Sequence, residues 1–320
     1  MDTGTHILIG VSLAGLATLD PGVAQNPFLT GTILMGTVIG SHAPDFDTIT
    51  RMKSYNLYLR THRGISHSLP ALLLWPALLT LALTGITGYF EEWFILYRWI
   101  FIAVFLHVGL DLLNSYGVQC MRPFSKKWYH LDILSIFEPF LFFLHLTGIC
   151  LWFFLMIPPK MIFPLVYGIS GIYIVFRTIH HFILVRRVKM QFAKRGKVHV
   201  FPTFQWFHWQ FVVEQEDRFY TGKIELGKLT IEEILTREER NPIIEATLST
   251  DGVRTFLSFA QRVHVTCHEI TDGYEVKWSD VRFWHNRKLP FGVDVKLDRD
   301  LKVVSSHLGW RKKYWDPPYL

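Results

Sequence analysis

The sequence predicts an α-helical integral membrane domain of about six apolar helices, followed by a mainly antiparallel β domain. Half of its 320 residues are hydrophobic and 15% are aromatic, more apolar than is usual for a soluble domain of this length. The apolar residues form long runs in the first part of the chain, and alternating patterns replace them later. We therefore expect a helical membrane domain over residues 1–190 and a cytoplasmic β-rich domain over 198–320.

The predicted helices are residues 5–19, 27–41, 69–90, 93–116, 137–157 and 161–185. The last four runs are long enough to cross a hydrocarbon core of ~30 Å, which needs about 20 helical residues. The first two are short and could instead form a re-entrant hairpin. In the second, Thr32, Gly36 and Gly40 form a row of small residues that lets another helix approach closely. The N-terminus lacks the basic region that a cleavable signal peptide needs, so none is expected.

Basic residues predict the orientation of these helices. The loops after the second, fourth and sixth runs hold Arg51, Lys53, Arg60, Arg63, Arg122, Lys126, Lys127, Arg186, Arg187, Lys189, Lys194, Arg195 and Lys197. The positive-inside rule places these loops and both chain termini in the cytoplasm. The net charge of +6 thus follows the membrane edge and forms no separate basic face, which argues against nucleic-acid binding.

Alternating apolar residues predict the strands of the second domain. The strands are expected near 206–213, 219–225, 262–269, 274–284 and 293–304, with a helix around 229–239. Asp272-Gly273 predicts a hairpin turn. Four aromatic residues could either form the core of this domain or dock it to the bilayer: Trp206, Trp209, Phe211 and Trp278.

The loop between the second and third apolar runs concentrates side chains that bind metals and anions. Asp45 and Asp47 are one residue apart, so they could bind one divalent metal or bridge two, although a helix-end turn would also explain them. His62 and His67 could converge on a metal, or lie in a solvated loop. Between them, Arg63 is a planar donor suited to a phosphate or a carboxylate.

Two further segments are expected to complete the site. His107 and Asp111 lie at i, i+4 in an otherwise apolar run, where an ionisable residue costs about 2.5–3.5 kcal/mol on insertion scales and therefore points to a function. The same spacing lets one helix face hold a metal, and a hydrogen-bonded pair without a metal is the alternative. His6 lies in the first apolar run, as a ligand or as a structural histidine.

The predicted ligand set is oxygen and nitrogen: His6, Asp45, Asp47, His62, His67, His107 and Asp111. The three cysteines are far apart and support neither a disulfide framework nor a zinc ribbon. We expect one or two divalent ions, with Zn²⁺ favoured and Mn²⁺ or Fe as alternatives.

These motifs together resemble a known family. Met-Asp-x-x-Thr-His at the start, Pro-Asp-Phe-Asp at 44–47, His-Arg-Gly-Ile-Ser-His-Ser at 62–68 and His-x-x-x-Asp at 107–111 resemble the bacterial YdjM-like inner-membrane proteins, described as membrane-bound metal-dependent hydrolases. The resemblance covers roughly residues 1–140 and implies a multi-pass protein of the bacterial inner membrane. The stretch Pro202–Trp209 resembles the β tail of Bacillus-type members. Glu138-Pro139 departs from the family's Asp-Pro.

A more distant similarity is to the zinc-dependent phospholipase C and nuclease P1 group. It implies His6, Asp45, His67 or His62, His107 and Asp111 as metal ligands. The group's second His-x-x-x-Glu pair is missing, so a complete trinuclear site is not expected.

The functional prediction is hydrolysis of a phosphoester, such as a lipid phosphoester, at the cytoplasmic face of the membrane. Asp45 would be a ligand and general base, and Arg63 would stabilise negative charge on the substrate and transition state. The alternative is a non-catalytic, metal-stabilised membrane regulator or scaffold. A transporter with a His–Asp pair on its ion path is a third hypothesis.

Overall fold

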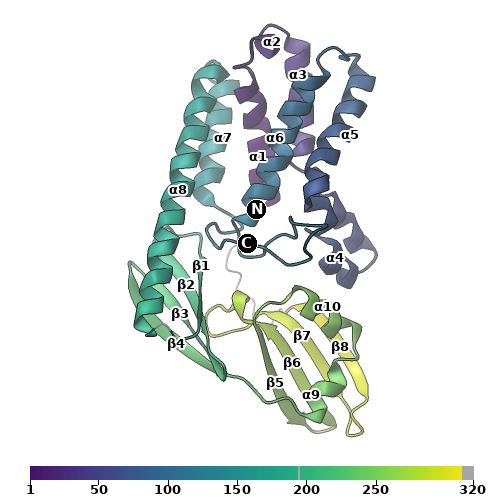
Figure 1. The fold of residues 1–320 in the computed structure, drawn as a ribbon, viewed down its shortest axis with the longest axis vertical. Helices are drawn as coiled ribbons and strands as arrows, with labels where there is room; N and C mark the ends of the chain where they lie inside the picture. The colour runs from purple at the N-terminus through teal and green to yellow at the C-terminus, as the bar shows by residue number, and fades with distance from the viewer. Residues whose placement is uncertain (194, 312–320) are drawn as a thin grey trace. The chain divides into compact units, whose positions relative to one another are not determined.

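In the computed structural model, which describes residues 1–193 and 195–311, the chain forms two units (Figure 1). The first contains Met1–Thr48 and Thr61–His180, and the second contains Ile49–Arg60 and the chain from His181 onward. The division differs from the predicted boundaries because residues 49–60 group with the β-rich unit. The predicted domain end at 312–320 lies outside the described residues.

Capping side chains and prolines determine where the helices of the first unit begin. Asp2, Asn26 and Ser68 each accept a hydrogen bond from the backbone N–H three residues on. Proline stands in the first turn of three helices, where its missing N–H has no cost. The elements are α1 (Thr3–Ala17), α2 (Pro21–Ala24), α3 (Pro27–Gly40), the 3-10 segment η1 (Ala43–Met52), α4 (Tyr55–Thr61), η2 (Ile65–His67), α5 (Leu69–Thr87), α6 (Trp93–Leu112), α7 (Pro139–Phe153) and α8 (Pro159–Gln191).

Within the described residues, three helices are long and apolar enough to cross a membrane: α5, α6 and α8. Helices α1, α3 and α7 are apolar but have only 14 or 15 residues, fewer than the roughly 17 that a spanning helix needs. The expectation that residues 137–157 form a helix of spanning length is therefore wrong. Pro139 begins α7, and its last residue, Phe153, lies well before Pro158 and Pro159.

Small residues bring the central helices close together. The row formed by Thr32, Gly36 and Gly40 faces α6, as its composition predicted. A Cβ atom on Gly36 would lie 2.9 Å from the Ile100 side chain, and one on Gly40 would lie 3.1 Å from it. Helix α1 packs on α3 in the same way, because a Cβ on Gly10 would lie 2.6 Å from Ser41 Oγ.

Gly10→Val is expected to separate α1 from α3 and to displace His6, one helical turn earlier on α1. We expect a loss of about 1–3 kcal/mol in stability, the usual cost of overpacking, together with lower metal content. Thermal unfolding and metal analysis of the purified protein would measure both effects. Gly31→Val is the matched control, because a Cβ there meets nothing within 4 Å. Equal behaviour of the two variants would contradict the expected role of this contact.

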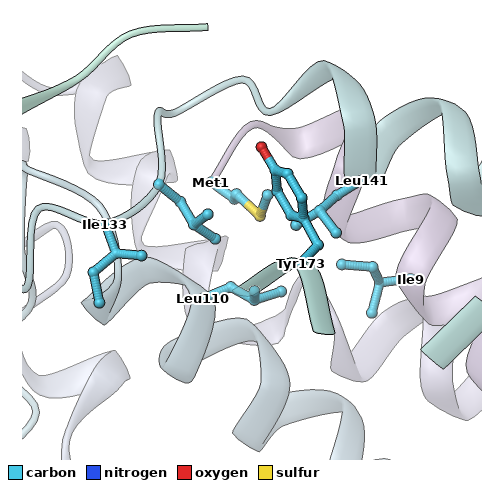
Figure 2. Packing of buried hydrophobic residues seen from close by; sticks show 7 residues of the cluster. Met1, Ile9, Leu110, Ile133, Leu141 and Tyr173 are labelled. Atoms are coloured by element: carbon cyan, nitrogen blue, oxygen red, sulfur yellow. The ribbon is translucent and has the colours of Figure 1, made fainter. Parts of the chain in front are cut away.

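A buried apolar cluster packs the ends of α1, α6, α7 and α8 against the loop before α7 (Figure 2). Its members are Met1, Ile9, Leu110, Ile133, Leu134, Leu141 and Tyr173. Leu110 directly precedes Asp111 on α6, so this cluster holds the end of that helix in place beside the polar residues described below.

The first sheet of the second unit is an antiparallel meander in the order β1-β2-β3-β4. Its strands are β1 (Lys197–Pro202), β2 (His208–Glu214), β3 (Arg218–Glu225) and β4 (Lys228–Thr236). One face packs on the end of α8, where Leu184 and Val188 contact a core that includes Trp209 and Phe211. Figure 1 shows this end of α8 lying along the sheet.

The second sheet has the order β5-β6-β7-β8, also antiparallel. Its strands are β5 (Val263–Ile270), β6 (Gly273–Asp280), β7 (Phe291–Leu297) and β8 (Val303–Trp310), with a 3-10 turn η3 (Val281–Phe283). Helices α9 (Pro242–Thr247) and α10 (Asp251–Phe259) pack on it. The Trp278 indole N–H donates to Thr247 Oγ1 at 3.0 Å, tying the sheet to α9.

The antiparallel β architecture and the hairpin at Asp272-Gly273 were predicted correctly. The helix expected around 229–239 is wrong, because this segment pairs along β3 as β4. Its mixed apolar pattern fits either period, and the ladder of backbone hydrogen bonds decides in favour of a strand. The run 293–304 contains parts of two strands. Three of the four aromatic residues are buried in the cores, namely Trp209, Phe211 and Trp278, whereas Trp206 is 42% exposed.

Candidate metal centre

Four donor side chains from three separate segments converge in the first unit. They are Asp45 on η1, His67 on η2, and His107 and Asp111 on α6, and one donor atom from each lies within 4.8 Å of the others. We call this set the inner position. Its residues are buried except Asp45, whose side chain is 19% exposed.

The spacing of the donor atoms matches a tetrahedral metal site. His67 Nε2 and His107 Nε2 are 3.2 Å apart. Asp45 Oδ1 lies 3.5 and 3.6 Å from these nitrogens, and Asp111 Oδ2 lies 3.5 and 3.7 Å from them. Metal–ligand bonds of about 2.0–2.1 Å put tetrahedral donors about 3.3–3.4 Å apart. Five of the six edges are thus close to the length that one ion would require.

Two buried oxygens in this set have no hydrogen-bond partner, Asp45 Oδ1 and Asp111 Oδ2. Leaving a buried acceptor unsatisfied costs about 1–3 kcal/mol, more if it is charged. Both oxygens face the two imidazole nitrogens across gaps longer than a normal hydrogen bond. A divalent cation would satisfy all four donors at once, so the residues present fit a metal.

Local structure aims each side chain at the inner position. His107 and Asp111 share one face of α6 because they are four residues apart. The Ser41 carbonyl lies 2.7 Å from His107 Nδ1, which leaves Nε2 facing the cluster, as expected for a metal-binding histidine. Ser66 Oγ is 3.0 Å from His67 Nδ1 and orients that ring in the same way.

The protonation states also suit metal binding. Burial lowers the pKa of His67 to about 3, so its imidazole is neutral and can act as a ligand. Burial by itself raises the pKa of Asp45, but the His107 and His67 rings that face its carboxylate outweigh this effect and hold the pKa well below its usual value. Asp45 is therefore an ionised carboxylate at neutral pH.

A second group adjoins the first and shares Asp45 with it. Asp45, Asp47 and His62 place one donor atom each within 4.8 Å of the others. His62 Nδ1 lies 2.7 Å from Asp47 Oδ1 and 3.9 Å from Asp45 Oδ1. We call this the outer position, because Asp47 and His62 are 12% and 17% exposed, whereas the inner histidines are fully buried. Asp45 could bridge two ions, and the outer one would be nearer to solvent.

His6 and His42 border the inner position. The His6 ring stacks on His107 with centroids 3.9 Å apart, and its Nε2 lies 3.6 Å from Asp111 Oδ1. Neither ring nitrogen of His6 has a hydrogen-bond partner. His42, which the sequence analysis did not select, lies edge-on to His6 at 6.4 Å and has a buried Nε2 without a partner. Its position three residues before Asp45 in Ser-His-Ala-Pro-Asp was the available signal.

Arg63 contacts the acids of the site directly. Its guanidinium donates to Asp111 Oδ1 at 3.1 Å and to Asn114 Oδ1 at 3.2 Å, and its backbone N–H donates to Asp47. The amino group of Met1 also donates to Asp111 Oδ1. These cations hold one carboxylate oxygen and leave Asp111 Oδ2 facing the histidines. The contacts assign Arg63 to positioning Asp111, whereas charge stabilisation on a substrate stays a prediction.

Other acids singled out in the sequence lie outside both groups. Asp2 caps α1 through Thr5. Glu138 is buried and accepts hydrogen bonds from Ser135 and from the Tyr173 hydroxyl, which ties the loop before α7 to α8. Asp132 pairs with His130 at 2.8 Å.

The comparisons with known proteins cover nearly the whole chain. Residues 1–184 match the model of the YdjM inner membrane protein family. Residues 195–234 match the YfhP middle domain, and 242–315 match the YfhP C-terminal alpha/beta plait domain. The chain is 34% identical over 317 residues to the "Uncharacterized protein YfhP" of Bacillus subtilis (strain 168), covering 97% of this chain and 95% of that protein. No solved structure matches significantly.

Proposed function

Since this chain belongs to the YdjM inner membrane protein family, we propose that it is a membrane-bound, metal-dependent hydrolase that cleaves a phosphoester at the membrane face. The observation that carries the proposal is the pairing of a buried tetrahedral donor set with a more exposed donor set through Asp45. A structural ion needs only a closed site, whereas a catalytic ion keeps a coordination position open. The outer position supplies only three side chains and is partly exposed, which favours catalysis there.

The inner ion would be held by Asp45, His67, His107 and Asp111, and the outer ion by Asp45, Asp47 and His62. Ions bound there would lower the pKa of a coordinated water and polarise a phosphoryl oxygen. Nitrogen and oxygen donors in near-tetrahedral arrangement favour Zn²⁺ at the inner position, and Mn²⁺ or Fe would accept the same donors.

The chain's own residues divide the remaining tasks. The lowered pKa of Asp45 makes it a strong ligand and a weak proton acceptor, so we assign it to metal bridging before general-base catalysis. Asp47 is more exposed to solvent than the inner donors, and its partners His62 and Ser66 hold its carboxylate in place. Arg63 positions Asp111 and keeps positive charge beside the site.

The substrate class follows from where the donors lie in the chain. The loop that carries Asp45, Asp47, His62 and His67 joins two apolar helices, α3 and α5, and the other two inner donors lie in the last turns of α6, a helix of spanning length. A site at the ends of such helices is close to the lipid headgroups, where a lipid-derived phosphoester is available. By the charge rule this would be the cytoplasmic face.

Asp47→Asn is expected to abolish turnover while leaving the inner ion bound. Purified full-length protein should contain close to two metal equivalents and the variant close to one. Release of phosphate-containing product from phospholipid vesicles should fall by at least about tenfold to a hundredfold, the size of effect seen when a metal's environment is altered. Metal analysis and a phosphorus NMR assay would measure the two quantities.

Asp132→Asn is the matched control, because Asp132 is a buried carboxylate in the same unit that lies outside both positions. A variant at Asp47 that keeps both ions and full turnover would contradict the proposed outer position. Parent protein that binds both ions yet hydrolyses no phosphoester would contradict the proposed reaction class.

A non-catalytic, metal-stabilised regulator or scaffold is the second candidate. The observation that favours it is the burial of the inner position, whose four donors can saturate one ion. Under this hypothesis Asp47→Asn would leave metal content and thermal stability unchanged, while loss of the inner ion would unfold the protein.

A further inference from the structure

Four exposed apolar side chains gather on the first sheet of the second unit. Phe204, Trp206 and Phe207 lie in the β1–β2 connection, and Leu226 lies in the β3–β4 turn, where it is 81% exposed. The backbone N–H of Leu226 donates to the Phe207 carbonyl at 3.1 Å, so the two turns are adjacent. We call these four residues the aromatic rim. It is separate from the core of this sheet, in which Trp209 and Phe211 are buried against α8.

Printed contacts determine where the rim lies along α8. The Trp209 indole N–H donates to the Trp206 carbonyl at 3.2 Å, and the Trp209 ring lies 5.8 Å from that of His181. The Arg187 guanidinium donates to the Gly227 carbonyl at 2.6 Å, next to Leu226. The rim is therefore level with the α8 segment from His181 to Arg187.

The same segment of α8 is where its lipid-compatible surface ends. The exposed side chains along the helix are apolar up to Phe182 and Ile183, and those that follow include Arg186, Arg187 and Lys189. From Pro159, about 20 helical residues cross a hydrocarbon core of ~30 Å and reach about residue 180. Aromatic side chains are enriched at this boundary because they are apolar with a polar edge.

The charges near the rim suit an anionic surface. Exposed basic side chains on α8 and in the β3–β4 turn are Arg186, Arg187, Lys189 and Lys228, with Glu225 as the adjacent acid. Each basic residue near an anionic leaflet contributes about 1 kcal/mol of attraction.

We propose that the aromatic rim inserts into the headgroup region of the leaflet from which α8 emerges, and so anchors the first sheet of the second unit to an anionic bilayer surface. The occupant of this apolar patch is lipid, because the patch continues the lipid-facing side of α8 at the depth where that helix leaves the bilayer. This inference is independent of the proposed hydrolase activity.

The test uses full-length protein in which Cys120, Cys150 and Cys267 are replaced by serine, with single cysteines at position 206 or 226 carrying an environment-sensitive fluorophore. Reconstitution is into vesicles of phosphatidylethanolamine and phosphatidylglycerol. Lipids that carry a spin label near the headgroup should quench both probes at least twofold and shift their emission to the blue. The matched control is a cysteine at Ile234, which is 50% exposed on the same sheet. It pairs with Tyr220, which packs on Phe192 beyond Arg187, farther along α8.

Quenching at 206 and 226 with an unquenched probe at 234 supports the proposal. Equal quenching at all three positions, or none at the first two, overturns it. Cross-linking of two copies through position 206 without quenching would make a second chain the occupant and also overturn it. The two rim positions lie on different turns, so a folding defect in one variant leaves the other as the test. Quenching that falls in phosphatidylcholine vesicles supports the charge contribution.

Discussion

Asp111→Asn is expected to eliminate metal binding at the inner position, with an affinity loss greater than the roughly 10–100-fold caused by changes outside the ligand shell. The substitution preserves the shape of the side chain but removes the charge that balances the ion. It also weakens the contact with Arg63, which donates to Asp111 at 3.1 Å within the protein interior. Metal titration of purified, chelator-treated protein would give the affinity, and metal analysis the number of ions.

The control is again Asp132→Asn, and its buried carboxylate should be replaceable without loss of metal. A monodisperse, thermally folded Asp111→Asn variant that binds metal as tightly as the parent would show that the inner position is not a metal site. His107→Ala should give the same loss as Asp111→Asn, because both donors belong to one ion. Loss in one variant alone would contradict a shared ion.

Asp280→Ala is expected to destabilise the second sheet of the β-rich unit by about 3–5 kcal/mol, the cost of breaking a buried ion pair. Asp280 accepts hydrogen bonds from Arg282 at 2.7 and 2.9 Å, and both side chains are fully buried. The guanidinium also lies over the Phe259 and Phe283 rings. Hydrogen exchange across residues 263–310 in the full-length protein should quicken by about two to three and a half powers of ten.

The control for this variant is Glu269→Gln, which breaks the exposed ion pair with Arg299 in the same sheet. Exposed pairs contribute little because water screens them, so exchange should stay close to that of the parent. If the two variants exchanged alike, the buried pair would not be what holds this sheet.

Sequence reasoning identified the residues of the candidate site because their chemistry stands out locally. His107 and Asp111 are conspicuous as polar residues in an apolar run, and their i, i+4 spacing places them on one helix face whatever surrounds them. It could not separate the roles of His62 and His67. They are five residues apart on opposite sides of Gly64, and the path of that turn puts His67 with the buried donors and His62 with the exposed ones. That path depends on contacts such as the Arg63 backbone N–H with Asp47, which no local pattern predicts.

The sequence by itself determined the class of the molecule: apolar helices followed by antiparallel strands, with nitrogen and oxygen donors in the loops and on one helix. Burial periodicity and ligand chemistry are properties of short segments, so they can be read without the fold. Only the tertiary structure decided which short helices fall below spanning length, that residues 228–236 form a strand, and that Asp45 is shared between two donor groups. Each of these depends on packing or pairing between segments far apart in the chain, where the contacting partner, and not the local sequence, decides the outcome.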